Sequence, residues 1–175
     1  MIYEGDSVSG LPFFKFAIGR KNMEKTITLG EREFKFKSSA ATNILYKRAF
    51  KEDILVKLSE YAKSIKELNK LKASVDALKN AEGKTEEEIL VELNALMNSD
   101  AYVKTQDFSS DTLPKLAYIM FLEANENIKT IFTKLNEDYY LEWLMTVDQD
   151  ELLTVTGEVM DIWQAGTKSH SKPKN

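Results

Sequence analysis

An apolar side chain recurs every three or four residues over the stretch that runs from Ile54 to Leu78. This spacing places the apolar side chains on one face of an α-helix, with Lys and Glu on the opposite face. It predicts a long helix from about Glu52 to Asn80. The chain of 175 residues has only three prolines and seven glycines, so few positions disfavour helix. A mainly α-helical fold is therefore expected, and a single domain is the default at this length.

The segment before this helix has a two-residue periodicity instead. Ile27 and Leu29 alternate with polar residues, and Phe34 and Phe36 do the same after a turn at Gly30. Period-two spacing on both sides of a glycine-containing turn predicts a β-hairpin. A two-stranded ribbon is marginally stable alone, so its apolar face should pack on the helices. The expected architecture is a mainly α, single-domain helical fold with a short N-terminal β-hairpin.

Capping residues predict where later helices begin. In the run from Thr85 to Glu88, the Thr hydroxyl and the last Glu carboxylate match a capping box. Asp148 and Glu151 repeat the pattern at the start of a last helix, which should end at about Gln164.

Proline and glycine positions add two further boundaries. Pro114 fits the first turn of a helix that begins at Asp111, after a polar stretch from 98 to 110. Gly166 suits the stop of the last helix. Two or three shorter helices are expected between Asn125 and that last helix.

These boundaries divide the chain into three parts. Residues 1–24 form a leader or extension with little periodicity. Residues 25–166 form the helical domain. Residues 167–175 are polar and basic, and we expect this tail to be disordered.

The residue types that perform most enzyme chemistry are scarce. There is no cysteine, and the single histidine, His170, lies in the tail, so thiolate sites, multi-His metal sites and His-based catalysis lack their residues. Neither GxGxxG nor GxxxxGK[ST] occurs. The acidic clusters 86–88 and 148–151 lie at helix starts, where carboxylates complement the helix dipole. The sequence therefore predicts a non-enzymatic protein, with no catalytic, cofactor-binding or metal-binding residues.

Nucleic acid and membrane are also not expected as partners. The formal net charge is −4, whereas nucleic-acid-binding domains are usually basic. The lysines of the long helix alternate with Glu60 and Glu67, which is typical of a solvated helix face. The longest apolar run, from Leu116 to Leu122, is much shorter than a membrane span. Acidic residues precede the N-terminal apolar segment, so a cytoplasmic location fits better than secretion.

Charge is unevenly distributed along the chain. Residues 47–72 carry eight basic and four acidic side chains, whereas residues 123–161 carry two basic and ten acidic ones. Two explanations are open: the charges belong to ordinary solvated helix faces, or they steer self-association or the capture of a charged partner.

Four aromatic residues in the second half of the chain are candidate partner-binding residues. Tyr and Trp are enriched in interface hot spots, yet core packing is the more frequent role of a Trp at helical spacing. The four residues are Tyr139, Tyr140, Trp143 and Trp163.

The segment from Ile27 to Leu55, ITLGEREFKFKSSAATNILYKRAFKEDIL, resembles the start of the tail assembly chaperones of long-tailed phages that infect Gram-positive bacteria. The resemblance consists of a Phe-x-Phe strand at 34–36, a Tyr-x-Arg patch at 46–48 and a Phe-x-x-Asp-Ile step at 50–54. Lys51 stands where the family usually has Gly. The later half, with Tyr-Leu-Glu-Trp-Leu at 140–144, is also similar, so the resemblance covers roughly residues 25–165.

The resemblance implies a non-enzymatic assembly factor of the host cell cytoplasm that is absent from the mature virion. Such a factor binds the tape measure protein, keeps it soluble and helps to recruit tail tube subunits, and it is expected to form homo-oligomers. The alternative is a helical adaptor or scaffold protein of another assembly system.

Overall fold

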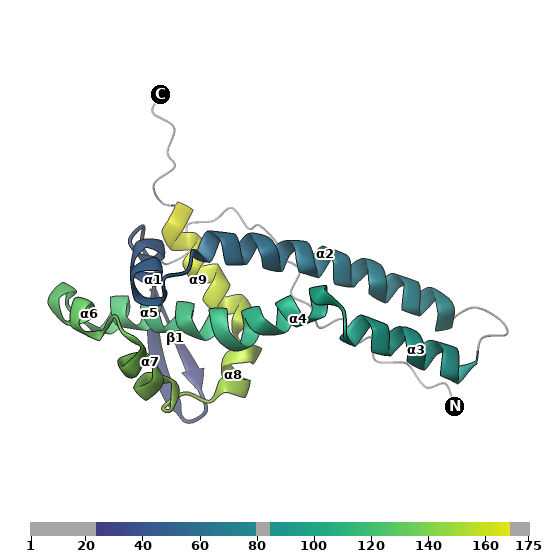
Figure 1. Ribbon diagram of the computed structural model, residues 1–175. Coiled ribbons are helices and arrows are strands. Elements are labelled where there is room, and N and C mark those ends of the chain that lie inside the picture. Colours follow the sequence, from purple (N-terminus) through teal and green to yellow (C-terminus); the bar gives the residue numbers. More distant parts are fainter. Residues whose placement is uncertain (1–23, 80–84, 169–175) are drawn as a thin grey trace.

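The computed structural model describes residues 24–79 and 85–168 (Figure 1). The leader before Glu24, the break at 80–84 and the tail after Lys168, with His170, lie outside the described residues. Within them the chain is mainly α-helical and begins with a two-stranded antiparallel hairpin, which confirms the predicted fold class.

The hairpin consists of β1 (Glu24–Leu29) and β2 (Arg32–Lys37). Its register places Ile27 opposite Phe34, and the turn at Gly30 has a φ of 63°, which glycine adopts without steric cost. The alternating apolar residues are buried, as expected, and β2 packs mainly on α5.

The first helix, α1 (Thr42–Phe50), ends at Lys51, which has a φ of 62°. The chain then turns into α2 (Ile54–Lys79), and every member of the predicted apolar stripe from Ile54 to Leu78 is at least partly buried. The predicted long helix is therefore confirmed, with bounds shifted by about two residues.

Helix α2 runs away from the rest of the molecule beside α3 (Glu86–Met97) and α4 (Asp100–Asp107) (Figure 1). We call α2, α3 and α4 the arm, and the remaining elements the body. The ring of Tyr61 on α2 stacks on that of Phe108, which directly follows α4, with centroids 4.1 Å apart. This contact joins α2 to α4.

The polar stretch before Pro114 is helical, contrary to prediction. Helix α4 continues through a π-helical turn, η1 (Phe108–Thr112), into α5 (Leu113–Asn125), so Asp111 does not begin a helix. The Leu113 amide bonds to the Phe108 carbonyl, five residues back. A proline ring would collide with the carbonyl four residues before it in a regular α-helix, and the wider π turn directly before Pro114 accommodates it.

The chain then forms α6 (Ile128–Lys134), α7 (Glu137–Leu144), α8 (Gln149–Thr154) and α9 (Thr156–Lys168). The predicted last helix is thus two helices that meet at Val155. Gly166 does not stop α9, because the helix continues to Lys168.

Helix α5 is the centre of the body. Apolar side chains on nearly all sides of it are buried, because β2, α1, α7 and α9 pack around it. A helix enclosed in this way can be apolar all round, which explains the run from Leu116 to Leu122.

Candidate functional site

Three of the four candidate partner-binding aromatics are core residues. Tyr140, Trp143 and Trp163 are buried, and only Tyr139 keeps an exposed ring. Trp143 lies among four other rings, with centroid distances of 5.5 Å to Tyr118, 5.8 Å to Phe121 and 6.5 Å to Phe34 and Tyr140. In the folded chain, any contact with a partner at this place therefore falls to Tyr139 and the exposed residues beside it.

Trp163 has a structural role at the other side of the body. Its indole Nε1 donates to Asn43 Oδ1 at 2.9 Å, and its carbonyl accepts from the Ser38 hydroxyl at 3.2 Å. These bonds tie α9 to the start of α1.

The buried tyrosines keep their phenolic protons at neutral pH. Burial, together with the nearby charge of Glu52, raises the pKa of Tyr46, and burial raises the pKa of Tyr140 to about 12. Burial also raises the pKa of Tyr118. The phenols serve as hydrogen-bond donors: Tyr46 to Glu52 Oε2 at 3.1 Å, and Tyr118 to the Lys134 carbonyl at 2.7 Å.

The acidic clusters at helix starts are caps, as predicted. Thr85 and Glu88 form the complete capping box of α3. At the start of α8 the structure shows one half of the predicted box, in which Asp148 Oδ1 accepts from the Glu151 amide at 3.1 Å. The Glu151 carboxylate binds the Gly30 amide and so holds α8 against the hairpin turn. Among the residues that the structure describes, no three His, Cys, Asp or Glu side chains are placed to hold a metal ion.

Glu123 is a largely buried carboxyl group on α5. The hydroxyls of Ser39 and Thr42 both donate to it, which locks the start of α1 onto α5. Burial raises the pKa of Glu123, and the two hydroxyl bonds oppose that shift. Its contacts indicate a structural role in the body.

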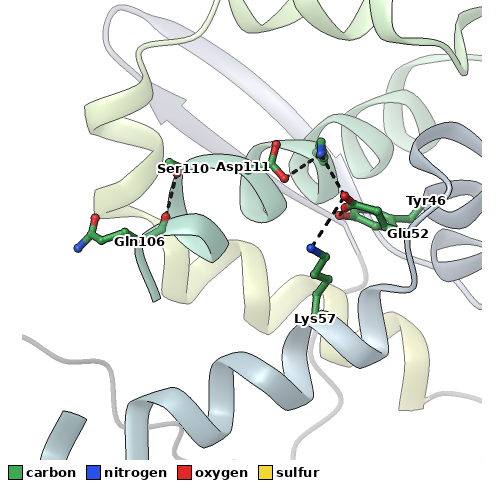
Figure 2. A network of polar contacts seen from close by, with 7 residues as sticks. Tyr46, Glu52, Lys57, Gln106, Ser110 and Asp111 are labelled. Carbon is green, nitrogen blue, oxygen red and sulfur yellow. Dashed lines mark hydrogen bonds and ion pairs between the residues drawn. The ribbon is translucent and has the colours of Figure 1, made fainter. Parts of the chain in front are cut away.

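A charged network lies where the arm meets the body (Figure 2). Lys115 of α5 has its Nζ 2.7 Å from Asp111 Oδ2 and 3.6 Å from Glu52 Oε1, and Lys57 of α2 has its Nζ 3.9 Å from that same Glu52 atom. Tyr46 completes the network through its bond to Glu52. Two lysines and two carboxylates balance each other, so the network links the start of α2 to α5 without leaving a net charge.

Helix α3 has an unusual environment. It carries six large apolar side chains, and none of them is buried. Leu90, Val91 and Met97 are 57%, 61% and 53% exposed, while Ile89, Leu93 and Leu96 are partly covered by the rest of the arm. The same helix has four glutamates and no basic residue. This exposed apolar and acidic side of α3, which we call the arm face, is the strongest candidate binding surface.

The uneven charge along the chain becomes only a partial separation in space, because the acidic helix α3 packs beside the basic α2 in the arm. The basic segment lies largely on α2, in the arm, and the acidic segment lies on the body helices from α6 to α9. Part of the acidic charge is paired within the body, as in Glu126 with Lys134 at 2.5 Å and Glu158 with Lys25.

Sequence reasoning missed both the arm face and the charged network. The sequence contained a signal for the arm face, because apolar residues occupy more of the circumference of α3 than one neighbouring helix can cover. The network had only a partial signal, because Asp111 and Lys115 are a helical i,i+4 pair, whereas Glu52 meets Lys115 only through tertiary packing.

Comparisons with known protein families, with characterised proteins and with solved structures give no significant match. In the described part of the chain, no helix combines the length and the apolar character needed to cross a membrane.

Proposed function

We propose that this chain is a tail assembly chaperone of a long-tailed phage, and that its arm face binds amphipathic helices of the tape measure protein. In this role it is a non-enzymatic protein of the infected cell, which keeps its client soluble until tail tube subunits assemble around it.

The observation that carries the proposal is the arm face. A third helix laid along α2 and α3 would bury Leu90, Leu93 and Met97 and would complete a three-helix arrangement. Contiguous exposed apolar surface on a helix marks a binding site for a protein. A chaperone for coiled-coil-prone segments needs this kind of surface.

The negative charge of the arm face indicates which kind of client helix it would bind. Glu86 and Glu87, which lie four and three residues before Leu90, are exposed on α3, and that helix contains no Lys or Arg. A client helix with an apolar stripe and basic flanking residues would match it, because complementary charge favours encounter and disfavours wrong partners.

One backbone feature supports the family resemblance. Lys51 stands where the resembled family usually has Gly, and it adopts a φ of 62° at the corner between α1 and α2. That conformation favours glycine, so the corner has the geometry that the family motif requires.

The test is co-expression with an aggregation-prone helical fragment of a tape measure protein. We expect the chain to keep the fragment soluble and to co-purify with it. Leu90→Asp with Met97→Asp should abolish both effects, because two charges in the arm face would be desolvated without partners. Ile44→Asp is the matched control, because Ile44 is 70% exposed on α1, outside the arm face, and should leave both effects intact.

Circular dichroism of both variants checks that they remain folded. Failure of the unaltered chain to solubilise the fragment would reject the tail chaperone function. Equal solubilisation by the doubly substituted chain would reject the arm face as the site. Binding of unrelated amphipathic helices with the same affinity would favour the general helical adaptor.

A further inference from the structure

The outward sides of α1 and α6 form an apolar patch on the body. Ile44 of α1 is 70% exposed, and Ile128 and Phe132 of α6 are 60% and 47% exposed. The Arg48 guanidinium lies 4.7 Å from the centre of the Phe132 ring, so the surfaces of the two helices are continuous. Both helices pack on α5 (Figure 1). We call these four residues the body patch.

A short aromatic segment of the same chain precedes the hairpin. Residues 11–16 read Leu-Pro-Phe-Phe-Lys-Phe, with four large apolar side chains in six residues. They lie outside the described residues, and residues 17–23 connect them to β1, which begins at Glu24. Because exposure of large apolar side chains to water is unfavourable, such a segment favours an apolar surface within its reach. We call residues 11–16 the aromatic segment.

The body patch is within reach of the aromatic segment. Eight residue steps separate the end of the segment from Glu24, and they span up to about 26 Å when extended. Glu24 pairs with Lys37 across the hairpin. The Thr42 amide donates to the Ser39 carbonyl at 3.2 Å, so the chain folds into a turn just before α1. Ile44 therefore lies closer to Glu24 than the extended length of the connection.

The arm face is too far away for the same connection. Glu123 of α5 binds the hydroxyls of Ser39 and Thr42, so it lies close to the end of the hairpin. From Glu123 the chain leads back through α5, η1 and α4 to Asp100 over about 35 Å, at 1.5 Å per helical residue, and α3 lies beyond that point. This distance exceeds the reach of the connection.

Charge also favours the body patch. Arg48 and Lys129 are exposed at or beside it. Residues 1–10, directly before the aromatic segment, contain Glu4 and Asp6 and no Lys or Arg. Opposite charges on the two sides of a contact favour the correct pairing.

We propose that the aromatic segment docks on the body patch of its own chain. A short tether gives the segment an effective concentration of about millimolar, so it outcompetes a separate copy or a partner at micromolar concentration. In the docked state the leader covers apolar surface of the body and leaves the arm face open to a client helix. The inference does not depend on the chaperone function, because the body patch lies outside the arm face.

Disulfide trapping tests the docking, because the chain has no cysteine of its own. Each of three variants combines Lys15→Cys with one further cysteine at an exposed position: Ala41→Cys beside the body patch, Lys35→Cys on β2, or Asn94→Cys on α3. Ala41 lies three residues before Ile44, so the two share a face. The Lys35 position controls for the tether, because it lies on the hairpin close to Glu24 but outside the body patch.

Under mild oxidation, the Ala41 pair should form its intramolecular disulfide at least about tenfold faster than the other two pairs, because docking holds the two sulfurs within bonding range. Non-reducing electrophoresis and mass spectrometry measure the rates. Addition of Ile44→Asp and Ile128→Asp should slow the Ala41 pair to the rate of the Lys35 pair, because the docked segment would desolvate two unpaired charges. Circular dichroism checks that this variant remains folded.

Equal rates for the Ala41 and Lys35 pairs would overturn the proposal. A fast Ala41 pair that the two aspartates leave unchanged would overturn it as well. A faster Asn94 pair would place the segment on the arm face and reject the body patch as its site. Disulfides found mainly at twice the mass of the 20.0 kDa chain would show instead that a second copy occupies the patch.

Discussion

Gly166 lies inside α9, directly against the backbone of Ser38 in the segment before α1. A methyl group at this position would collide with the Ser38 carbonyl group and hydroxyl. The sequence suggested a helix stop here, since glycine is common after helix ends. The structure assigns it another role, because the absence of a side chain lets α9 approach Ser38 closely.

Gly166→Ala should therefore destabilise the protein. We expect the free energy of unfolding to fall by about 2–3 kcal/mol, because the added methyl group meets backbone that cannot rotate away. Urea denaturation followed by circular dichroism measures the effect.

Gly157 provides a control in the same helix. An added Cβ at Gly157 meets nothing within 4 Å. Gly157→Ala should raise stability by up to about 1 kcal/mol, because alanine has the higher helix propensity. An equal effect of the two substitutions would show that α9 does not pack on Ser38 as described.

At the scale of elements, α4, η1 and α5 behave as one helix with an inserted π turn. The turn contains one residue more than an α-helical turn, so it rotates the side chains of α4 relative to α5 by about 100°. That rotation directs Phe108 and Ala101 toward α2 while α5 fills the centre of the body.

Deletion of Ser109 should convert this turn into regular α-helix. The arm would then lose the stacking of Tyr61 on Phe108, and the Pro114 ring would collide with a carbonyl of the preceding turn. We expect a loss of about 3 kcal/mol or more in stability, comparable to removal of a buried aromatic ring.

Thermal unfolding compares this deletion with Ser110→Ala. The control removes only the exposed bond from Ser110 Oγ to the Gln106 carbonyl and should change stability by less than about 0.5 kcal/mol. A deletion variant as stable as the control would mean that the π turn does not set the orientation of the arm.

At the scale of the whole molecule, burial divides the chain into a densely packed body and a thinner arm. Helix α5 is enclosed on nearly all sides, whereas α3 contains no buried residue. Local opening costs least where few apolar contacts must be broken. The two parts should therefore differ in their protection from solvent.

Native-state hydrogen exchange should reveal this difference. Amides of α5 should exchange only with global unfolding, and those of α3 should exchange much faster. The comparison uses the two helices in one sample, so conditions are identical. Equal protection of both helices would contradict the division into body and arm.

The predictions that the structure confirms are those that depend on short-range sequence patterns. The hairpin register at Ile27 and Phe34, the stripe of α2 and the caps at Thr85 and Asp148 depend on residues close together in the sequence. The helical nature of residues 100–110 was missed because that stretch has little apolar periodicity of its own. It is helical because Ala101 and Phe108 pack on α2.

The sequence by itself determined the mainly α class, the N-terminal hairpin and the starts of α3 and α8, because periodicity and capping act over a few residues. Only the tertiary structure decided which apolar residues are covered. Trp143 and Trp163 became core because β2 and α1 pack against them, whereas Leu90 and Met97 stayed exposed because the arm has no further layer. Burial depends on what lies opposite a helix face, and no short-range pattern contains that information.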